Sequence, residues 1–162
     1  LAGAQVEAQI REATGQRKFT DFFSYPVADF IRMSRAAMAL LSPRLGSPEG
    51  VLRWMGEHSV LSFLNTVAGK TPFMLAGGNV KRLINQLPTS YKAAVSYGER
   101  SVAWTGERSG RLVFKRDFMP PAYHEGVLVT VISRLRTQNV RVRGLSTRPV
   151  GAEYGLRWGE PL

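Results

Sequence analysis

Apolar residues recur every three or four positions from residue 5 to residue 87, which is the spacing of helices with one apolar face. Four helices are predicted in this half, over residues 5–13, 27–42, 47–68 and 80–87. Ser47 and Pro48 are typical of a helix start, because serine caps the first turn and proline needs no hydrogen-bond partner there. Pro43, Gly69 and Pro88 are each expected to end a helix.

Two glycine positions in this half have an expected structural role. Gly56 lies inside the third predicted helix, where glycine costs about 0.5–1 kcal/mol relative to alanine, so we expect another helix to approach closely there. Gly77 and Gly78 break the chain before Asn79, which is expected to cap the fourth helix. A helix start can hold an anion, but no strand precedes this one and no Gly-Lys-Ser/Thr follows, so a capped loop is the favoured interpretation.

After Pro88 the apolar spacing changes from about 3.6 to 2, which is typical of strands. Strands are predicted over residues 94–98, 100–105, 111–118, 140–145 and 152–158, with a helix over 123–137. Strands and helices do not alternate along the chain, so a parallel sheet is not expected. We predict an α+β fold in which N-terminal helices pack on one face of an antiparallel sheet of about five strands, with one helix inserted before the last two strands. The length fits a single domain over 1–162, with 1–18 as an N-terminal helix or extension and 19–158 as the core.

Positive charge is concentrated in the second half of the chain. The net charge is +10, of which residues 1–80 carry +2 (8 Lys/Arg against 6 Asp/Glu) and residues 81–162 carry +8 (14 against 6). Seven basic residues form a candidate surface for an anionic partner: Arg111, Lys115, Arg134, Arg136, Arg141, Arg143 and Arg148. Strand periodicity places Arg141 and Arg143 on one face, and pairing with the strand over 111–118 would add Arg111 and Lys115. Such a face can contact phosphates, so a nucleic-acid-binding domain is one interpretation and a solvated basic surface is the other.

Residues that carry catalysis are scarce. The chain has no cysteine, which excludes disulfides, thiol catalysis and cysteine-ligated metals. Its two histidines, His58 and His124, have no Glu, Asp or His three or four residues away, so each is interpreted as a surface or capping residue. No Gly-x-Ser-x-Gly element is present, and the twelve acidic residues offer no evident catalytic pair. We therefore expect no enzyme, no metal site and no cofactor.

Membrane and export elements are not evident in the sequence. No stretch approaches the roughly 20 apolar residues of a membrane helix, so no transmembrane segment is expected. The N-terminus lacks the basic-then-apolar order of a signal peptide, and a cytoplasmic location is expected. The chain begins at Leu1 instead of a methionine, so we expect it to be part of a longer product.

Several short motifs, taken in order, resemble a paralogous family of uncharacterised proteins expanded in myxobacteria. They are Tyr25-Pro26, the segments 37–43, 48–56 and 63–70, Gly126, and Tyr154-Gly155-Leu156-Arg157-Trp158. The resemblance spans residues 19–158. That family is distantly similar to the ligand-binding fold of nitric-oxide sensors, vinyl-reductase-type sensor domains and subunits of the TRAPP vesicle-tethering complex.

This resemblance implies helices packed on an antiparallel sheet and a domain that binds a ligand or serves as a dimerising adaptor. The haem-binding branch uses a helical histidine and a Tyr-x-Ser-x-Arg element, which Tyr97-Gly98-Glu99-Arg100-Ser101 does not match, so haem is not expected. The first hypothesis is a non-enzymatic sensor or adaptor domain that binds a small apolar or anionic ligand, or a protein partner, as a homodimer or with another chain. The alternative is a basic nucleic-acid-binding domain.

Overall fold

The computed structural model describes residues 3–15, 19 and 24–159. The chain forms two compact units, 1–52 and 53–162. The predicted boundary at residue 18 lies outside the described residues. No helix in the described ranges is long and apolar enough to cross a membrane.

The first unit contains helices α1 (Ala4–Glu12) and α2 (Val27–Leu45) and the beginning of α3 (Pro48–Leu64). The prediction that Pro43 ends the second helix is wrong, because α2 continues through it for two residues. Proline removes only one hydrogen bond here, and the helix ends instead at Gly46, whose φ of 84° suits glycine. The predicted cap of the next helix is confirmed: the Ser47 hydroxyl accepts a hydrogen bond from the Gly50 N–H at 3.0 Å.

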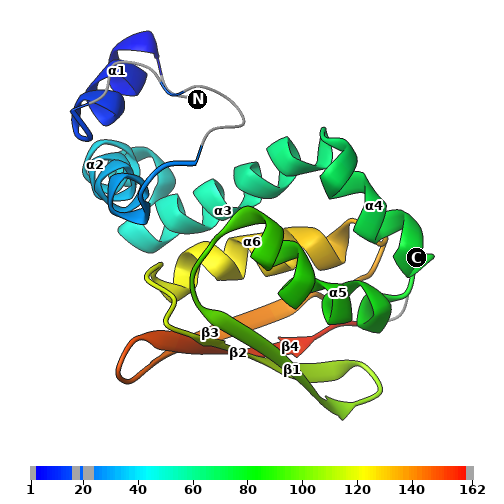
Figure 1. Cartoon of the computed structure of the whole chain (residues 1–162). Helices are drawn as coiled ribbons and strands as arrows, with labels where there is room; N and C mark the ends of the chain where they lie inside the picture. The colour runs from blue at the N-terminus through cyan, green and yellow to red at the C-terminus, as the bar shows by residue number, and fades with distance from the viewer. Residues whose placement is uncertain (1–2, 16–18, 20–23, 160–162) are drawn as a thin grey trace. The chain divides into compact units, whose positions relative to one another are not determined.

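The second unit contains the rest of α3 and every strand that the structure describes. Its further elements are α4 (Val67–Ala76), α5 (Val80–Ala94), β1 (Glu99–Gly106), β2 (Ser109–Lys115), α6 (Pro121–Ser133), β3 (Arg141–Thr147) and β4 (Gly151–Arg157). The sheet is antiparallel with the order β1-β2-β4-β3. Helices α5 and α6 lie against one face of this sheet (Figure 1). The predicted α+β class, the antiparallel sheet and the helix before the last two strands are confirmed.

Three predicted boundaries in this unit are wrong. The predicted helix over 47–68 is interrupted after Leu64, because the Thr66 hydroxyl accepts from the Gly69 N–H at 3.1 Å and begins α4. Helix α5 continues through Pro88 to Ala94, since Leu87 and Tyr91 pack against the core. Residues 94–98 therefore form no strand, and the described sheet has four strands instead of about five.

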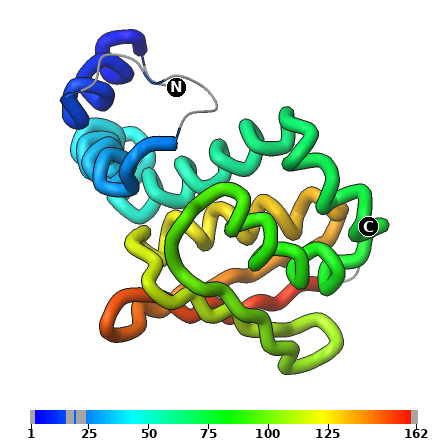
Figure 2. Tube along the Cα trace, viewed as in Figure 1, coloured from blue at the N-terminus to red at the C-terminus, as the bar shows by residue number. Residues whose placement is uncertain are grey.

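The sheet buries its inner face against α5 and α6, which Figure 2 shows as the layer directly over the strands. The buried residues of this core include Leu112 and Phe114 on β2, Tyr154 and Leu156 on β4, Ile84 on α5, and Leu128 and Ile132 on α6. The strand predicted over 111–118 ends at Lys115, before Arg116 with φ 53°, and Phe118 beyond it is 47% exposed. Helix α6 ends at Ser133, four residues before the predicted end.

Helices α3 and α6 cross at two glycines. A Cβ on Gly56 would lie 2.1 Å from the Tyr123 carbonyl oxygen, and a Cβ on Gly126 would lie 2.1 Å from the Arg53 carbonyl oxygen. No side chain fits at such distances, so each glycine allows the backbone of the other helix to approach. The predicted role of Gly56 is confirmed, and eight of the 13 residues of α6 are buried.

Candidate functional site

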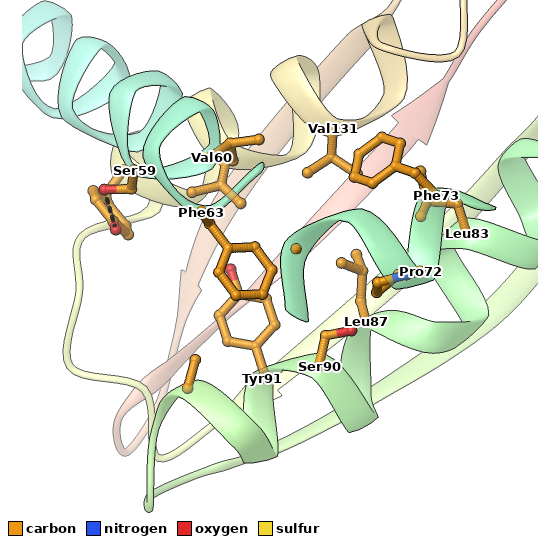
Figure 3. Close-up of a pocket in the computed structure, with 14 residues that line it drawn as sticks. Ser59, Val60, Phe63, Pro72, Phe73, Leu83, Leu87, Ser90, Tyr91 and Val131 are labelled. Atoms are coloured by element: carbon orange, nitrogen blue, oxygen red, sulfur yellow. Dashed lines mark hydrogen bonds between the residues drawn. The ribbon is translucent and has the colours of Figure 1, made fainter. Parts of the chain in front are cut away.

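A cavity of about 290 Å³ opens among α3, α4, α5 and α6 on the side of the helices away from the sheet. Its walls are mostly apolar and include Val60, Phe63, Pro72, Phe73, Leu87 and Val131 (Figure 3). Small-molecule sites in proteins typically have volumes of roughly 300–1,000 Å³ and mainly apolar walls with a few polar groups. This cavity lies at the small end of that range, so it suits a compact apolar ligand.

Helical spacing explains how the sequence builds these walls. Val60 and Phe63 lie three residues apart on α3, and Val127 and Val131 lie four apart on α6, so each pair shares a helix face. Helix α4 closes the cavity because Gly69 lets it turn back on α3: a Cβ there would lie 2.1 Å from the Phe63 carbonyl oxygen. The cavity therefore depends on the break between α3 and α4, which the sequence analysis expected four residues later, after residue 68.

Four polar side chains interrupt the apolar wall: Ser59, Ser90, Tyr91 and Tyr123. The Tyr123 hydroxyl donates to Ser59 Oγ at 2.9 Å, and Ser59 in turn donates to the Met55 carbonyl at 2.9 Å. The Tyr91 hydroxyl lies 3.0 Å from His124 Nδ1. Among the described residues none forms a hydrogen bond with the Ser90 hydroxyl. Ser90 is thus the polar group in this wall that is available to a ligand.

Behind Tyr91 lies a buried polar network centred on Asp117. Its carboxylate accepts from Arg100 Nη2 at 2.6 Å, from His124 Nε2 at 3.0 Å and from the Met119 N–H at 3.1 Å. The His124 ring joins the two groups, with Nε2 toward Asp117 and Nδ1 toward the Tyr91 hydroxyl. The Arg100 guanidinium stacks 4.4 Å from the centre of the Tyr91 ring. The network joins α5, α6, β1 and the segment after β2.

The surroundings determine the charge of these groups. Burial alone would raise the pKa of Asp117, but the hydrogen bonds from His124 and Met119 and the charge of Arg100 hold this pKa below its ordinary value of 3.8. Burial raises the pKa of Tyr91 well above its usual value, and nearby Tyr123 and Asp117 add to the effect. Burial also raises the pKa of Tyr123. Asp117 is thus a carboxylate and both tyrosines are neutral at pH 7, so the two tyrosine hydroxyls in the pocket wall are polar but uncharged.

His124 corrects the interpretation of the histidines. It is 3% exposed and lies within the network, so its assignment as a surface or capping residue is wrong. His58 is exposed, and its Nδ1 lies 2.9 Å from the Trp54 carbonyl oxygen. Within the described residues, no group of three or more His, Asp or Glu side chains is arranged to hold a metal ion.

The lining residues do not fit haem. Haem iron is held by a histidine, cysteine, methionine or tyrosine, and its propionates need basic partners. The described lining contains no histidine, cysteine, methionine, lysine or arginine. Its two tyrosines are neutral, and their hydroxyls contact Ser59 and His124. No step through haem is derived for this pocket.

The seven predicted basic residues fall into two groups. Arg111, Lys115, Arg141 and Arg143 are exposed and alternate with inward-facing residues of β2 and β3, so they share the outer face of the sheet. The other three lie in exposed connections: Arg134 and Arg136 follow α6, and Arg148 lies between β3 and β4. The sequence analysis missed Arg157, which joins the first group from β4. Strand periodicity could have identified it, because Arg157 follows the inward-facing Leu156 and must therefore point outward.

Comparisons with known proteins identify a family and several solved structures that are similar to this chain. A family model described as "Protein of unknown function (DUF2378)" matches residues 1–159. Similar solved structures include an Fe(II) unliganded H-NOX protein from K. algicida, with 11% identity and a TM-score of 0.71 over 99% of this chain and 89% of that chain. A Cs H-NOX mutant has 11% identity and a TM-score of 0.75 over 100% of this chain and 90% of that one.

A third similar structure is an oxygen-binding H-NOX domain related to soluble guanylate cyclases, with 10% identity and a TM-score of 0.67 over 98% and 88% of the two chains. No curated protein sequence matches the chain. The TM-scores show a shared fold, and at identities this low the similarity shows the fold alone. The predicted resemblance to a family of unknown function and to the fold of nitric-oxide sensors is thereby confirmed.

Proposed function

The chain belongs to the DUF2378 family, and we propose that it is a ligand-sensing domain whose pocket binds a small, predominantly apolar molecule. The observation that carries this proposal is the apolar cavity among α3, α4, α5 and α6, within a fold shared with H-NOX proteins. Those relatives include an oxygen-binding domain in its oxygen complex and an Fe(II) protein. The ligand proposed here differs from haem, because the lining holds no free iron ligand and no basic group.

The wall restricts the chemistry of the ligand. Buried apolar side chains favour an apolar body, at about 25 cal/mol for each Å² removed from water. The Ser90 hydroxyl can form one hydrogen bond with a ligand atom, since no described residue occupies it. A ligand with a hydrocarbon body and a single hydroxyl or carbonyl group matches both features. A charged ligand would lose its hydration without gaining an opposite charge.

Binding without catalysis is the proposed activity. A ligand in this pocket would contact four helices at once, so it would favour the arrangement in which they close around it. That change can be passed to a protein partner or to a second copy of the chain, as in an adaptor. The polar network supports this role, because it fixes Tyr91 and leaves α4 as the wall that adjusts to the ligand.

Binding of a neutral fluorescent probe tests the proposal. N-phenyl-1-naphthylamine is apolar and uncharged, so the basic sheet face does not attract it. We expect the wild-type protein to bind it, and Val131→Phe to weaken binding by about tenfold or more, because the added ring atoms occupy the cavity. The matched control is Val67→Phe, the same change at a position on α4 that is 83% exposed.

Circular dichroism spectra must show that both variants are folded. Equal probe affinity in folded Val131→Phe and in the wild type would refute binding in this pocket. Weakened binding in Val67→Phe alone would place the probe on the outer surface of α4, and would refute the assignment as well.

A further inference from the structure

Four arginines surround a glycine on the outer face of the sheet, opposite the face that α5 and α6 cover. Gly155 on β4 pairs with Arg111 on β2 and with Arg143 on β3. The next outward residue of β4, Arg157, pairs with Arg141 on β3. These residues border a hollow of about 390 Å³, together with Thr105 and Ser109. The sheet therefore brings together four guanidinium groups that are up to 46 residues apart in sequence.

Gly155 is the reason for the hollow. A Cβ at this position would meet only the Arg143 carbonyl oxygen, at 4.0 Å, so the space above the backbone is open. Neighbouring strands lie about 4.8 Å apart, so the long side chains of Arg111 and Arg143 rise on either side of a bare strip of backbone. The result is a shallow basin with a flat floor and cationic walls.

The charges in this basin are largely uncompensated. Arg111 pairs with Glu153 at 3.0 Å, and both side chains are well exposed. Among the described residues none forms an ion pair with Arg141, Arg143 or Arg157. Like charges directly opposite each other on neighbouring strands destabilise a sheet, and Arg141 and Arg157 are such a pair. An anion above Gly155 would remove this repulsion.

We propose that the basin binds a phosphate group, as a phosphomonoester or diphosphate, in a site separate from the apolar pocket. Guanidinium groups bind phosphate oxygens through pairs of parallel hydrogen bonds, and a compact dianion can be reached from several sides of the basin. The floor carries no side chain that would hold the anion away from the strands. Ser109 and Thr105, whose hydroxyls lie 3.0 Å apart at the rim, add neutral hydrogen-bond capacity.

The arrangement favours a single phosphate group over a nucleic-acid strand. Readers of single strands combine a basic groove with exposed aromatic rings, and the described outward positions of β1–β4 carry no aromatic residue. The cations also converge on one point. Lys115 lies four residues from Arg111 along β2, roughly 13 Å away, and Arg148 lies in the connection after β3.

Titration calorimetry with inorganic pyrophosphate tests the site in the whole chain. We expect Arg143→Gln/Arg157→Gln to weaken binding by about tenfold or more, because it removes two charge-assisted partners. The matched control is Lys115→Gln, a charge loss on the same face outside the basin, which should leave the affinity nearly unchanged. Gly155→Asp should abolish binding, since it places a carboxylate on the floor in open space. Probe binding in the apolar pocket should be unaffected in all three variants, which separates the two sites.

A further titration with lipid vesicles, compared with the pyrophosphate titration, identifies the source of the phosphate. Binding to phosphatidylcholine vesicles that contain phosphatidic acid, lost in the double variant and in Gly155→Asp, would support the basin with a lipid headgroup as its ligand. Pyrophosphate binding with the same losses would support a soluble phosphate compound. The proposal is overturned if Lys115→Gln weakens binding as much as the double variant does, or if neither phosphate source binds. Tight binding of a single-stranded oligonucleotide that all these charge changes weaken alike would instead support a nucleic-acid surface.

Discussion

Replacing Gly56 by alanine tests the close crossing of α3 and α6. The new methyl carbon would lie 2.1 Å from the Tyr123 carbonyl oxygen and 2.9 Å from the Val127 nitrogen. Both are backbone atoms of α6, so no side chain can rotate away, and the helices must separate by about 1 Å. Overpacking costs about 1–3 kcal/mol, and contact with backbone places this case at the upper end. Alanine recovers about 1 kcal/mol through its helix propensity, which leaves a net loss of about 2 kcal/mol.

Thermal unfolding followed by circular dichroism measures this loss. For a chain of this size, 1 kcal/mol corresponds to about 2–4 °C, so we expect Gly56→Ala to lower Tm by roughly 4–8 °C. The control is Gly155→Ala, which adds the same methyl group in open space and should change stability by less than about 0.5 kcal/mol. Gly126→Ala meets the Arg53 carbonyl oxygen at the same crossing, so the double variant should lose less than the two single losses combined.

The result that refutes this reasoning is specific. If Gly56→Ala has a Tm equal to or above that of the wild type, the two backbones do not approach as closely as the structure shows. Strict additivity of Gly56→Ala and Gly126→Ala would mean that the two glycines do not serve the same contact.

Two further predictions concern buried charge and helix capping. Asp117→Asn should lower the free energy of unfolding, measured in urea, by about 3–5 kcal/mol, because it leaves Arg100 buried without its partner. The folded-state pKa of Asp117 lies below its unfolded value, so the stabilisation by its carboxylate is fully present above about pH 4 and is lost as pH falls through the lower folded pKa. The difference in unfolding free energy between wild type and Asp117→Asn should therefore narrow in acid. A difference that stays constant with pH would contradict the lowered pKa. Asn79→Ala should lower the free energy of unfolding by about 1 kcal/mol, since the Asn79 side chain accepts from the Arg82 N–H at 3.0 Å. Asn79→Asp keeps an acceptor and should retain most of the stability. Equal losses in the two variants would show that the cap is not the cause.

The strands and their inward faces could be predicted from the sequence because alternation is a local property. Leu112 and Phe114 on β2 and Tyr154 on β4 follow it directly, and all three are buried. The helix ends could not be predicted as well, because they depend on contacts distant in sequence. Pro88 weakens one turn of α5, but Tyr91 beyond it packs on Phe114, and that burial outweighs the local cost.

The candidate site was less accessible to sequence reasoning. Its apolar lining comes from four helices, and the break at Thr66 that positions α4 lies inside a continuous apolar pattern. His124 had no recognisable partner nearby, since Tyr91 is 33 residues away and Asp117 lies outside α6, in the segment after β2. The basic face was partly predictable: strand parity gave Arg141 and Arg143 correctly, whereas their convergence on Gly155 required the pairing of β4 with β2 and β3.

The position of α6 between the pocket and the sheet determines how substitutions in it act. Val127 and Val131 face the pocket, while Leu128 and Ile132 face the sheet, so each substitution in α6 is selected for ligand shape and for folding together. Helix α4 carries no such double constraint, since Phe73 lines the pocket while Met74 and Leu75 are exposed. We therefore expect substitutions in α4 to change ligand preference with little effect on folding, whereas substitutions in α6 should affect both.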